Sequence, residues 1–471
     1  MKPDKRVAIS ADEQLSRLQS AVQMLRGGRR PEAVAALRVL TVMAPANTDA
    51  HRLLGVALSE TGDLAGAEIA FRAALAQRPG EAAIAVGLVE ALIGQKKGAE
   101  AVQALAPFVN EQTTNFELLT WLGLALQSAD RPAEASAMLK RAVRVSPESG
   151  LAHHNLAGSL ADEHRYSEAE AEVARARELG LEAPELLLVE GRAARGQNRL
   201  GEAIDRFAGA VRLRPTYDLA IVELAETIWV ATGDADQALR VYDEARKIQS
   251  GDRDLARHKA KLQEEIGDYA GAYATLKDAL SRLETPELQI FAAQVAVYID
   301  VQAALEHARR AVAMGARNEA AQAALAQVFL AMNEPRLAAN VIEGLTSRLP
   351  VDQYGWALTA VAWRMLGDPR YARLYDYERM VLRADIDTPG GWSRLDDYLA
   401  DLAAELRPLH VARGHQIGQS MRLGSQTESD LARETSPAIA AFPQAIDGPI
   451  HRYMQALGKG RDPLRGRLKS G

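Results

Sequence analysis

Hydrophobic residues between positions 48 and 79 follow the period of two consecutive helices. Leu54 and Leu58 are four positions apart in the first half, and Ala67 and Phe71 are four positions apart in the second half. Positions with this spacing lie on one face of an α-helix. The segment therefore predicts two amphipathic helices that pack against each other.

The same pattern returns about every 34 residues along most of the chain. Turn signals separate the paired helices at Gly62, Gly233, Gly267 and Gly367, where glycine can take the left-handed conformation that ends a helix. One extra residue precedes Gly233, and we expect it to lengthen the loop. The pattern predicts about eleven helix–turn–helix units over residues 14–386, with starts near residues 14, 48, 82, 116, 150, 184, 218, 253, 285, 319 and 353.

These units resemble the tetratricopeptide repeat. The resemblance implies a mainly α fold, an α-solenoid whose first helices line a concave groove, and a protein or peptide partner in that groove. The middle units place polar and aromatic side chains at positions expected to face inward, namely His154, Arg192, Arg195, Glu226, Trp229, Arg257 and Lys261. The alternative for these residues is a set of solvated helix faces with ion pairs between neighbouring turns.

Composition narrows the classes of function. A chain of 471 residues exceeds the size at which one hydrophobic core stops growing, which favours an array of small units. With 56 Lys and Arg against 62 Asp and Glu, the net charge of −6 gives no general attraction for nucleic acid. The chain has no cysteine, which excludes thiolate metal sites. It also has no apolar run typical of a secretory signal or a membrane span, so we expect a cytoplasmic protein without a membrane partner.

The repeat spacing ends near residue 386, and the Pro-Gly-Gly sequence within Thr388–Trp392 predicts a break before a different segment, residues 387–471. We expect Ser393 to begin an amphipathic helix with Leu395 and Leu399 on its buried face. At the other end of the chain, residues 1–13 are expected to form an N-terminal tail.

The string between Gly418 and Thr427 resembles the opening of a bacterial family of 2-oxoglutarate/Fe(II) oxygenases that are often fused behind tetratricopeptide repeats. The residues that carry this resemblance are Gln419, Ser420, Arg422, Gln426 and Thr427. It implies that residues 387–471 form a short, incomplete α/β segment of a double-stranded β-helix domain.

Such oxygenases bind Fe(II) through two histidines and one carboxylate, and the first two ligands are one residue apart on a strand. No histidine of this chain has Asp, Glu or His two positions further on. We therefore expect no catalytic, cofactor-binding or metal-binding residues here, with Fe(II) and 2-oxoglutarate involved only if a fuller domain exists. The sequence leaves open whether the protein is an enzyme.

The favoured function is thus an interaction scaffold attached to the start of an oxygenase domain. One alternative is a pure repeat adaptor with no enzymatic role. A repeat-containing glycosyltransferase or sulfotransferase is less favoured, because the chain lacks both an asparagine ladder along its repeats and a phosphate-binding loop.

Overall fold

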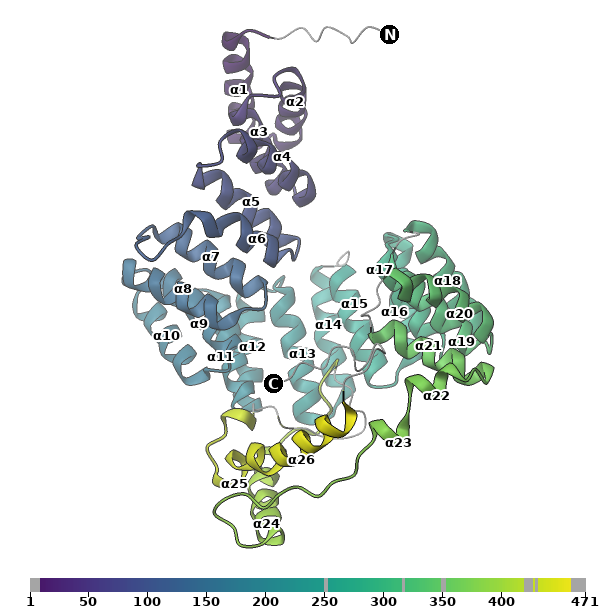
Figure 1. Cartoon of the computed structure of the whole chain (residues 1–471). Coiled ribbons are helices and arrows are strands. Elements are labelled where there is room, and N and C mark those ends of the chain that lie inside the picture. Colours follow the sequence, from purple (N-terminus) through teal and green to yellow (C-terminus); the bar gives the residue numbers. More distant parts are fainter. Residues whose placement is uncertain are drawn as a thin grey trace. The chain divides into compact units, whose positions relative to one another are not determined.

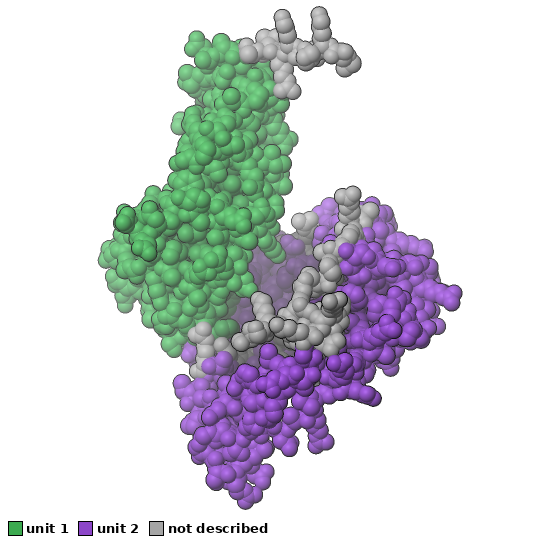
Figure 2. Space-filling view, in the orientation of Figure 1, with its two compact units in different colours: residues 1–193 green, residues 194–471 purple. Residues whose placement is uncertain are grey.

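The computed structural model describes residues 9–249, 253–315, 318–348, 353–418, 427 and 431–458. The chain divides into two compact units, unit 1 with residues 1–193 and unit 2 with residues 194–471 (Figure 2). Both units are helical, and the described residues contain no strand.

Unit 1 is a stack of helical hairpins (Figure 1). Each helix from α1 to α9 packs against the next helix in the chain, and the first helices of successive hairpins also pack against one another. The helices are α1 (Ala11–Arg26), α2 (Arg30–Met43), α3 (Thr48–Glu60), α4 (Leu64–Gln77), α5 (Ala82–Gly94), α6 (Gly98–Leu105), η1 (Ala106–Phe108), α7 (Phe116–Ser128), α8 (Pro132–Val145), α9 (Gly150–Asp162), α10 (Tyr166–Glu178) and the greater part of α11 (Pro184–Gly196).

The turns inside the hairpins share one residue in the left-handed conformation. Gly62 has a φ of 82°, as the glycine signal predicts. The following residue, Asp63, donates its N–H to the carbonyl of Leu58 at 2.9 Å, which closes the end of α3. Non-glycine residues take the same conformation in other hairpins, with φ between 57° and 61°, at Lys96, Asp130, His164, Asn198 and Asn333. Glycine is thus sufficient but not necessary for this turn.

Small residues allow the paired helices to approach closely. The alanines at the expected packing positions are fully buried, with 0% of their surface exposed, at Ala67, Ala135, Ala169, Ala203 and Ala272. In unit 1 the ring of Phe71 fills the space beside them, against Gly55 of α3 and Gly87 of α5. The core of each unit therefore consists of alanine contacts with Leu and Phe between them.

Unit 2 continues the hairpins and ends in a set of shorter helices. The eleventh pair is incomplete in the described residues, because its second helix, α22, has five residues where α20 has 14. The paired helices are α12 (Leu200–Leu213), α13 (Asp218–Thr232), α14 (Ala235–Ile248), α15 (Arg253–Glu265), α16 (Tyr269–Arg282), α17 (Pro286–Ala296), α18 (Val301–Met314), α19 (Glu319–Ala331), α20 (Pro335–Arg348), α21 (Gln353–Leu366) and α22 (Arg370–Leu374).

The extra residue before Gly233 lengthens a helix and not a loop, which corrects the sequence-based expectation. Helix α13 has 15 residues, whereas α3 has 13. Only Gly233 and Asp234 connect α13 to α14, because Gly233 ends α13 in the left-handed conformation and Asp234 caps α14 directly.

The segment after residue 387 is also corrected, since its described residues form helices and irregular structure and not an α/β segment. Its elements, together with the short helix that precedes them, are α23 (Tyr377–Met380), α24 (Leu395–Leu406), η2 (Arg407–Leu409), η3 (Leu431–Arg433), α25 (Pro437–Ala440) and α26 (Phe442–Leu457) (Figure 1).

The buried anchor of these C-terminal helices is Tyr398, which is 0% exposed and donates its hydroxyl to the carbonyl of Ala438 at 3.1 Å. The carboxylate of Glu405 accepts the backbone N–H groups of Ala438 and Ile439 at 2.9 and 3.0 Å, so it caps the start of α25. Helix α24 begins after Arg394 and not at the expected Ser393. Leu399, which is expected on the buried face of this helix, is 41% exposed.

Candidate functional site

The middle and C-terminal turns of α13 and the C-terminal turns of α15 in unit 2 carry a dense group of charged and aromatic side chains. We call it the α13–α15 surface and define it by Glu223, Glu226, Trp229, Val230, Lys261 and Glu265. Arg195, from the last turn of α11, forms an ion pair with Glu223 at 2.6 Å. Lys261 forms an ion pair with Glu265 at 2.7 Å. Three carboxylates and two cations therefore lie close together.

Electrostatics at this surface are dominated by its carboxylates. Burial raises the pKa of Glu226 to about 7, and repulsion from Glu223 and Glu265 adds to this effect, whereas Arg195 opposes it. The phenol of Tyr242 is 2% exposed, and burial, together with Glu226 and Glu223, raises its pKa well above the usual value. Arg195 and Lys261 are paired with Glu223 and Glu265, and Glu226 keeps its proton up to about pH 7.

Glu265 has an unusual position, because it is the last residue of α15 and its side chain is only 1% exposed. The negative end of the helix dipole, at the C-terminus of α15, repels a carboxylate at this position. Compensation comes from Lys261 and from the backbone N–H of Gly418, which donates to Glu265 Oε1 at 3.3 Å. Two sources of positive potential thus hold this buried carboxylate.

A non-helical segment of the same unit, residues 411–418, lies on the α13–α15 surface. The backbone N–H groups of Arg413 and Gly414 both donate to the carbonyl of Val230, at 2.8 and 3.0 Å. The indole Nε1–H of Trp229 donates to the carbonyl of His415 at 2.9 Å. Because α13 ends at Thr232, the Val230 carbonyl lacks the helical N–H partner four residues on, and the segment supplies two.

Side chains of the segment complete these contacts. Ala412 is buried in a small apolar cluster with Val230 and Leu200, against the Trp229 ring. The imidazole of His415 meets the indole of Trp229 edge to face, with ring centroids 5.6 Å apart. His415 Nε2 lies 3.6 Å from Glu265 Oε2 and makes no hydrogen bond among the described atoms.

Five of the residues predicted to face the groove belong to unit 2. Arg195, Glu226, Trp229 and Lys261 come together at the α13–α15 surface. Arg257 lies about two turns before Glu265, the last residue of α15. Its Nη2 donates to His258 Nε2 at 3.0 Å.

The other two predicted groove residues, His154 and Arg192, belong to unit 1. Burial lowers the pKa of His154, although the charge of Glu185 opposes this, and its Nδ1 has no hydrogen-bond partner among the described atoms. Arg192 is half-buried on α11. The seven predicted residues therefore do not form one described site.

Four residues of the oxygenase-like string, Gln419, Ser420, Arg422 and Gln426, lie outside the described residues. Thr427 is described as half-buried and belongs to no helix. Among the residues that the structure describes, no group of three or more His, Asp or Glu side chains could hold a metal ion. In the same part of the chain, no helix is both long and apolar enough to cross a membrane.

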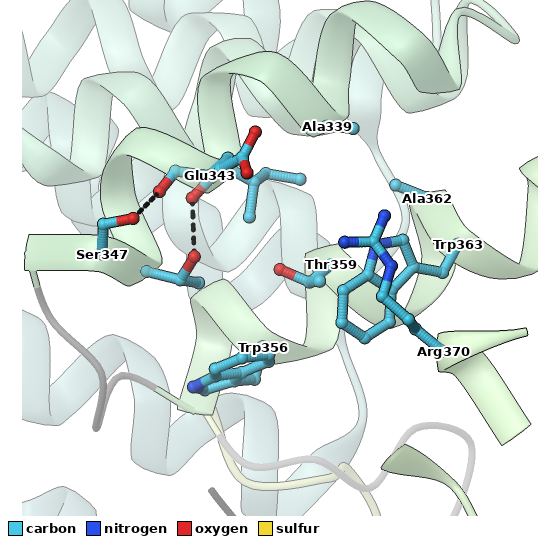
Figure 3. A pocket seen from close by; sticks show the side chains of 10 residues that line it. Ala339, Glu343, Ser347, Trp356, Thr359, Ala362, Trp363 and Arg370 are labelled. Atoms are coloured by element: carbon cyan, nitrogen blue, oxygen red, sulfur yellow. Dashed lines mark hydrogen bonds between the residues drawn. The ribbon is translucent and has the colours of Figure 1, made fainter. Parts of the chain in front are cut away.

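A pocket of about 360 Å³ lies between α20 and α21 (Figure 3). The rings of Trp356 and Trp363 line it with centroids 6.2 Å apart, and the guanidinium of Arg370 lies 4.6 Å from the centre of the Trp363 ring. The pocket occurs beside the five-residue helix α22, which is too short to cover α21 as a full second helix would. We assign no ligand to it.

Sequence reasoning missed Glu265, Gly414 and His415 as parts of the site. One local signal existed, because Glu264 and Glu265 end a helix where the dipole disfavours acidic residues. No local signal connects His415 to Trp229, since the two residues are 186 positions apart.

Family models of the tetratricopeptide repeat match residues 24–82, 122–180 and 155–218, and a second model of the same repeat matches residues 60–118. The chain therefore contains tetratricopeptide repeats, as the sequence pattern predicts. A curated protein of Sinorhizobium fredii (strain NBRC 101917 / NGR234), "Uncharacterized protein y4yS", is 34% identical over 96 residues, which are 20% of this chain and 53% of that protein. This chain thus covers about half the length of that relative.

Solved structures show similarity to parts of the chain. Pseudomonas aeruginosa PilF is 23% identical, with a TM-score of 0.37, over 46% of this chain and 96% of that one. MamA from Desulfovibrio magneticus RS-1 is 20% identical, with a TM-score of 0.34, over 36% of this chain and 97% of that one. Yeast Tom70 is 13% identical, with a TM-score of 0.33, over 77% of this chain and 97% of that one.

Proposed function

We propose that this protein is an interaction scaffold that binds a non-helical segment of a partner protein on the α13–α15 surface. The observation that carries the proposal is the seating of residues 411–418 on that surface through backbone hydrogen bonds. Contacts to the backbone depend little on side-chain identity, so a surface that holds one bent, non-helical segment in this way can hold another.

The test uses the full chain with Gly414→Leu, a change designed to displace residues 411–418. A Cβ on Gly414 would lie 2.5 Å from the carbonyl oxygen of Trp229, which is closer than backbone atoms permit. A fluorescent synthetic peptide with the sequence of residues 409–418 is expected to bind this variant in an anisotropy titration. The matched control is Gly201→Leu, because a Cβ there meets no atom within 4 Å.

Binding to Gly414→Leu and much weaker binding to Gly201→Leu and the wild type would support the proposal. If residues 411–418 are displaced and the variant binds neither this peptide nor its sequence variants, the α13–α15 surface is not a docking site for such segments.

We also propose, from the resemblance of the Gly418–Thr427 string alone, that the scaffold delivers its partner to a 2-oxoglutarate/Fe(II) oxygenase domain. The described residues do not fit the metal that such a domain needs, since they contain no cluster of three possible ligands. The support is therefore limited to sequence, and no catalytic step is assigned to this chain.

Succinate release from 2-oxoglutarate tests the catalytic side of this proposal. We expect the purified chain with added Fe(II) to release no more succinate than the same chain with a chelator. Fe(II)-dependent release above that control would mean that this chain holds a complete metal site.

A further inference from the structure

The contact between residues 411–418 and α13 imposes a size limit at one position. Gly414 lies against Trp229 so closely that a Cβ on it would be 2.5 Å from the carbonyl oxygen and 2.9 Å from ring atom Cε2 of that residue. The carbonyl belongs to the helix backbone, and the indole is fixed by its hydrogen bond to the His415 carbonyl. A segment seated in this register therefore needs glycine at this position.

The next position along the segment faces a buried negative charge. The His415 side chain is 7% exposed, and its Nε2 lies 3.6 Å from the carboxylate of Glu265, whose side chain is 1% exposed. Lys261 pairs with the other oxygen of this carboxylate, Oε1, at 2.7 Å, so the segment faces Oε2. A side chain that carries a positive charge at this position would be attracted, and a carboxylate would be repelled.

We propose that the α13–α15 surface selects a non-helical partner segment in which a glycine is immediately followed by a basic residue, and that residues 411–418 compete with this partner for the surface. This inference rests on the proposed function, because it specifies the segment that the scaffold would bind. The glycine fits against Trp229, and the basic side chain lies beside Glu265.

Residues 411–418 compete with a partner for the α13–α15 surface because they belong to the same chain as that surface. A segment in the same chain has an effective concentration in the millimolar range, far above that of most partners. Occupation by residues 411–418 reduces the fraction of chains that are open to a partner, and the apparent affinity falls by the same factor. Displacing the segment should therefore strengthen binding of an added peptide by about tenfold or more.

Displacement is measured first, by tryptic cleavage after Arg413. Its backbone N–H is bound to the Val230 carbonyl in the seated segment, and its side chain is exposed. We expect trypsin to cut there several-fold faster in full-length Gly414→Leu than in Gly201→Leu or the wild type. Equal rates would mean that leucine is accommodated against Trp229, which overturns the glycine requirement.

Selectivity is measured next, with variants of the peptide of residues 409–418 added to Gly414→Leu. In the peptide, His415→Lys or His415→Arg should preserve binding, and His415→Glu should weaken binding by about tenfold or more. Gly414→Leu in the peptide should abolish it. A second variant of the chain carries Trp229→Phe together with Gly414→Leu. It lacks the indole N–H donor and should bind the peptide several-fold more weakly.

The outcomes separate the two proposals. If all peptides bind the Gly414→Leu chain equally, including those in which glutamate replaces His415 or leucine replaces Gly414, the docking site stands and the selectivity is wrong. If no peptide binds although Arg413 is cut faster, both are wrong. If the wild-type chain forms a dimer that Gly414→Leu abolishes, the occupant is the segment of a second copy, and the assignment to a different partner is overturned.

Discussion

The ring of Phe71 lies 2.8 Å from the point that a Cβ on Gly55 would occupy. The same ring lies 2.7 Å from the corresponding point on Gly87 of the next hairpin. One phenyl group thus requires glycine on two first helices, α3 and α5.

Gly55→Ala should therefore destabilise unit 1, although alanine normally favours a helix over glycine. Overpacking against the buried ring is expected to lower the free energy of unfolding by about 1–3 kcal/mol in urea denaturation. Phe71→Leu in the same chain should recover part of the Gly55→Ala loss. As a control, Gly344→Ala has no neighbour within 4 Å of the new Cβ and should add about 0.5–1 kcal/mol. A loss of equal size at both glycines would contradict the role of Phe71.

Lys96 has an unfavourable backbone conformation at its turn, with a φ of 60°. A non-glycine residue in the left-handed region is strained, so Lys96→Gly should raise the free energy of unfolding by about 0.5–1 kcal/mol. The reverse change at the equivalent turn, Gly62→Lys, should lower it by about 1 kcal/mol, because Gly62 has a φ of 82°. Thermal melting of both variants provides the measurement, and opposite shifts of the midpoint are expected.

The raised pKa of Glu226 makes stability depend on pH. The folded-state pKa is about 7, above the ordinary value of 4.5, so the folded chain keeps a proton that the unfolded chain loses between these values. The stabilisation is therefore complete below about pH 4.5 and is lost as the pH rises to about 7, by about 3 kcal/mol at most.

Glu226→Gln should remove this part of the pH dependence, because glutamine does not titrate. The measurement is urea denaturation of the wild type and the variant at pH 5 and pH 7.5. The wild type should lose more stability than the variant between the two pH values. Parallel losses would show that Glu226 ionises normally in the folded chain.

Tyr398 is expected to hold the C-terminal helices together. Tyr398→Phe removes the hydrogen bond to the Ala438 carbonyl and should cost about 1 kcal/mol, and Tyr398→Ala should cost about 3–5 kcal/mol. Hydrogen exchange in α24 and α26 reports the effect. Leu399→Ala on the same helix is the control, because this side chain is 41% exposed, and its exchange rates should change little.

The repeats could be predicted because their determinants are local. The expected starts at residues 48, 82 and 116 coincide with the first residues of α3, α5 and α7. Turns without glycine were harder, because Lys96 and His164 give no sequence signal for a positive φ. The extra residue at α13 was placed wrongly, because spacing alone does not show whether a helix or a loop absorbs it.

The C-terminal segment and the site depended on contacts that sequence does not encode locally. The apolar pattern of residues 395–406 predicted a helix correctly but placed Leu399 on the buried face, where the structure has Tyr398. Tyr398 can occupy the buried position because its hydroxyl has a hydrogen-bond acceptor 40 positions away, the Ala438 carbonyl. The sequence identifies Trp229, Glu226 and Lys261 as candidate site residues. It gives no sign that residues 411–418, much further along the chain, lie against the α13–α15 surface.

The hydrogen bond between Trp229 and His415 joins residues 186 positions apart and so closes a loop that contains α14–α24. In an open array each repeat depends on its two neighbours, and the terminal repeats fray first. While residues 411–418 stay seated on α13, the last hairpins of unit 2 can unfold only within this closed loop, which lowers the entropy of their unfolded state. Release of residues 411–418 by a partner would open the loop, so binding at α13 would lower the stability of hairpins as far along the chain as α21.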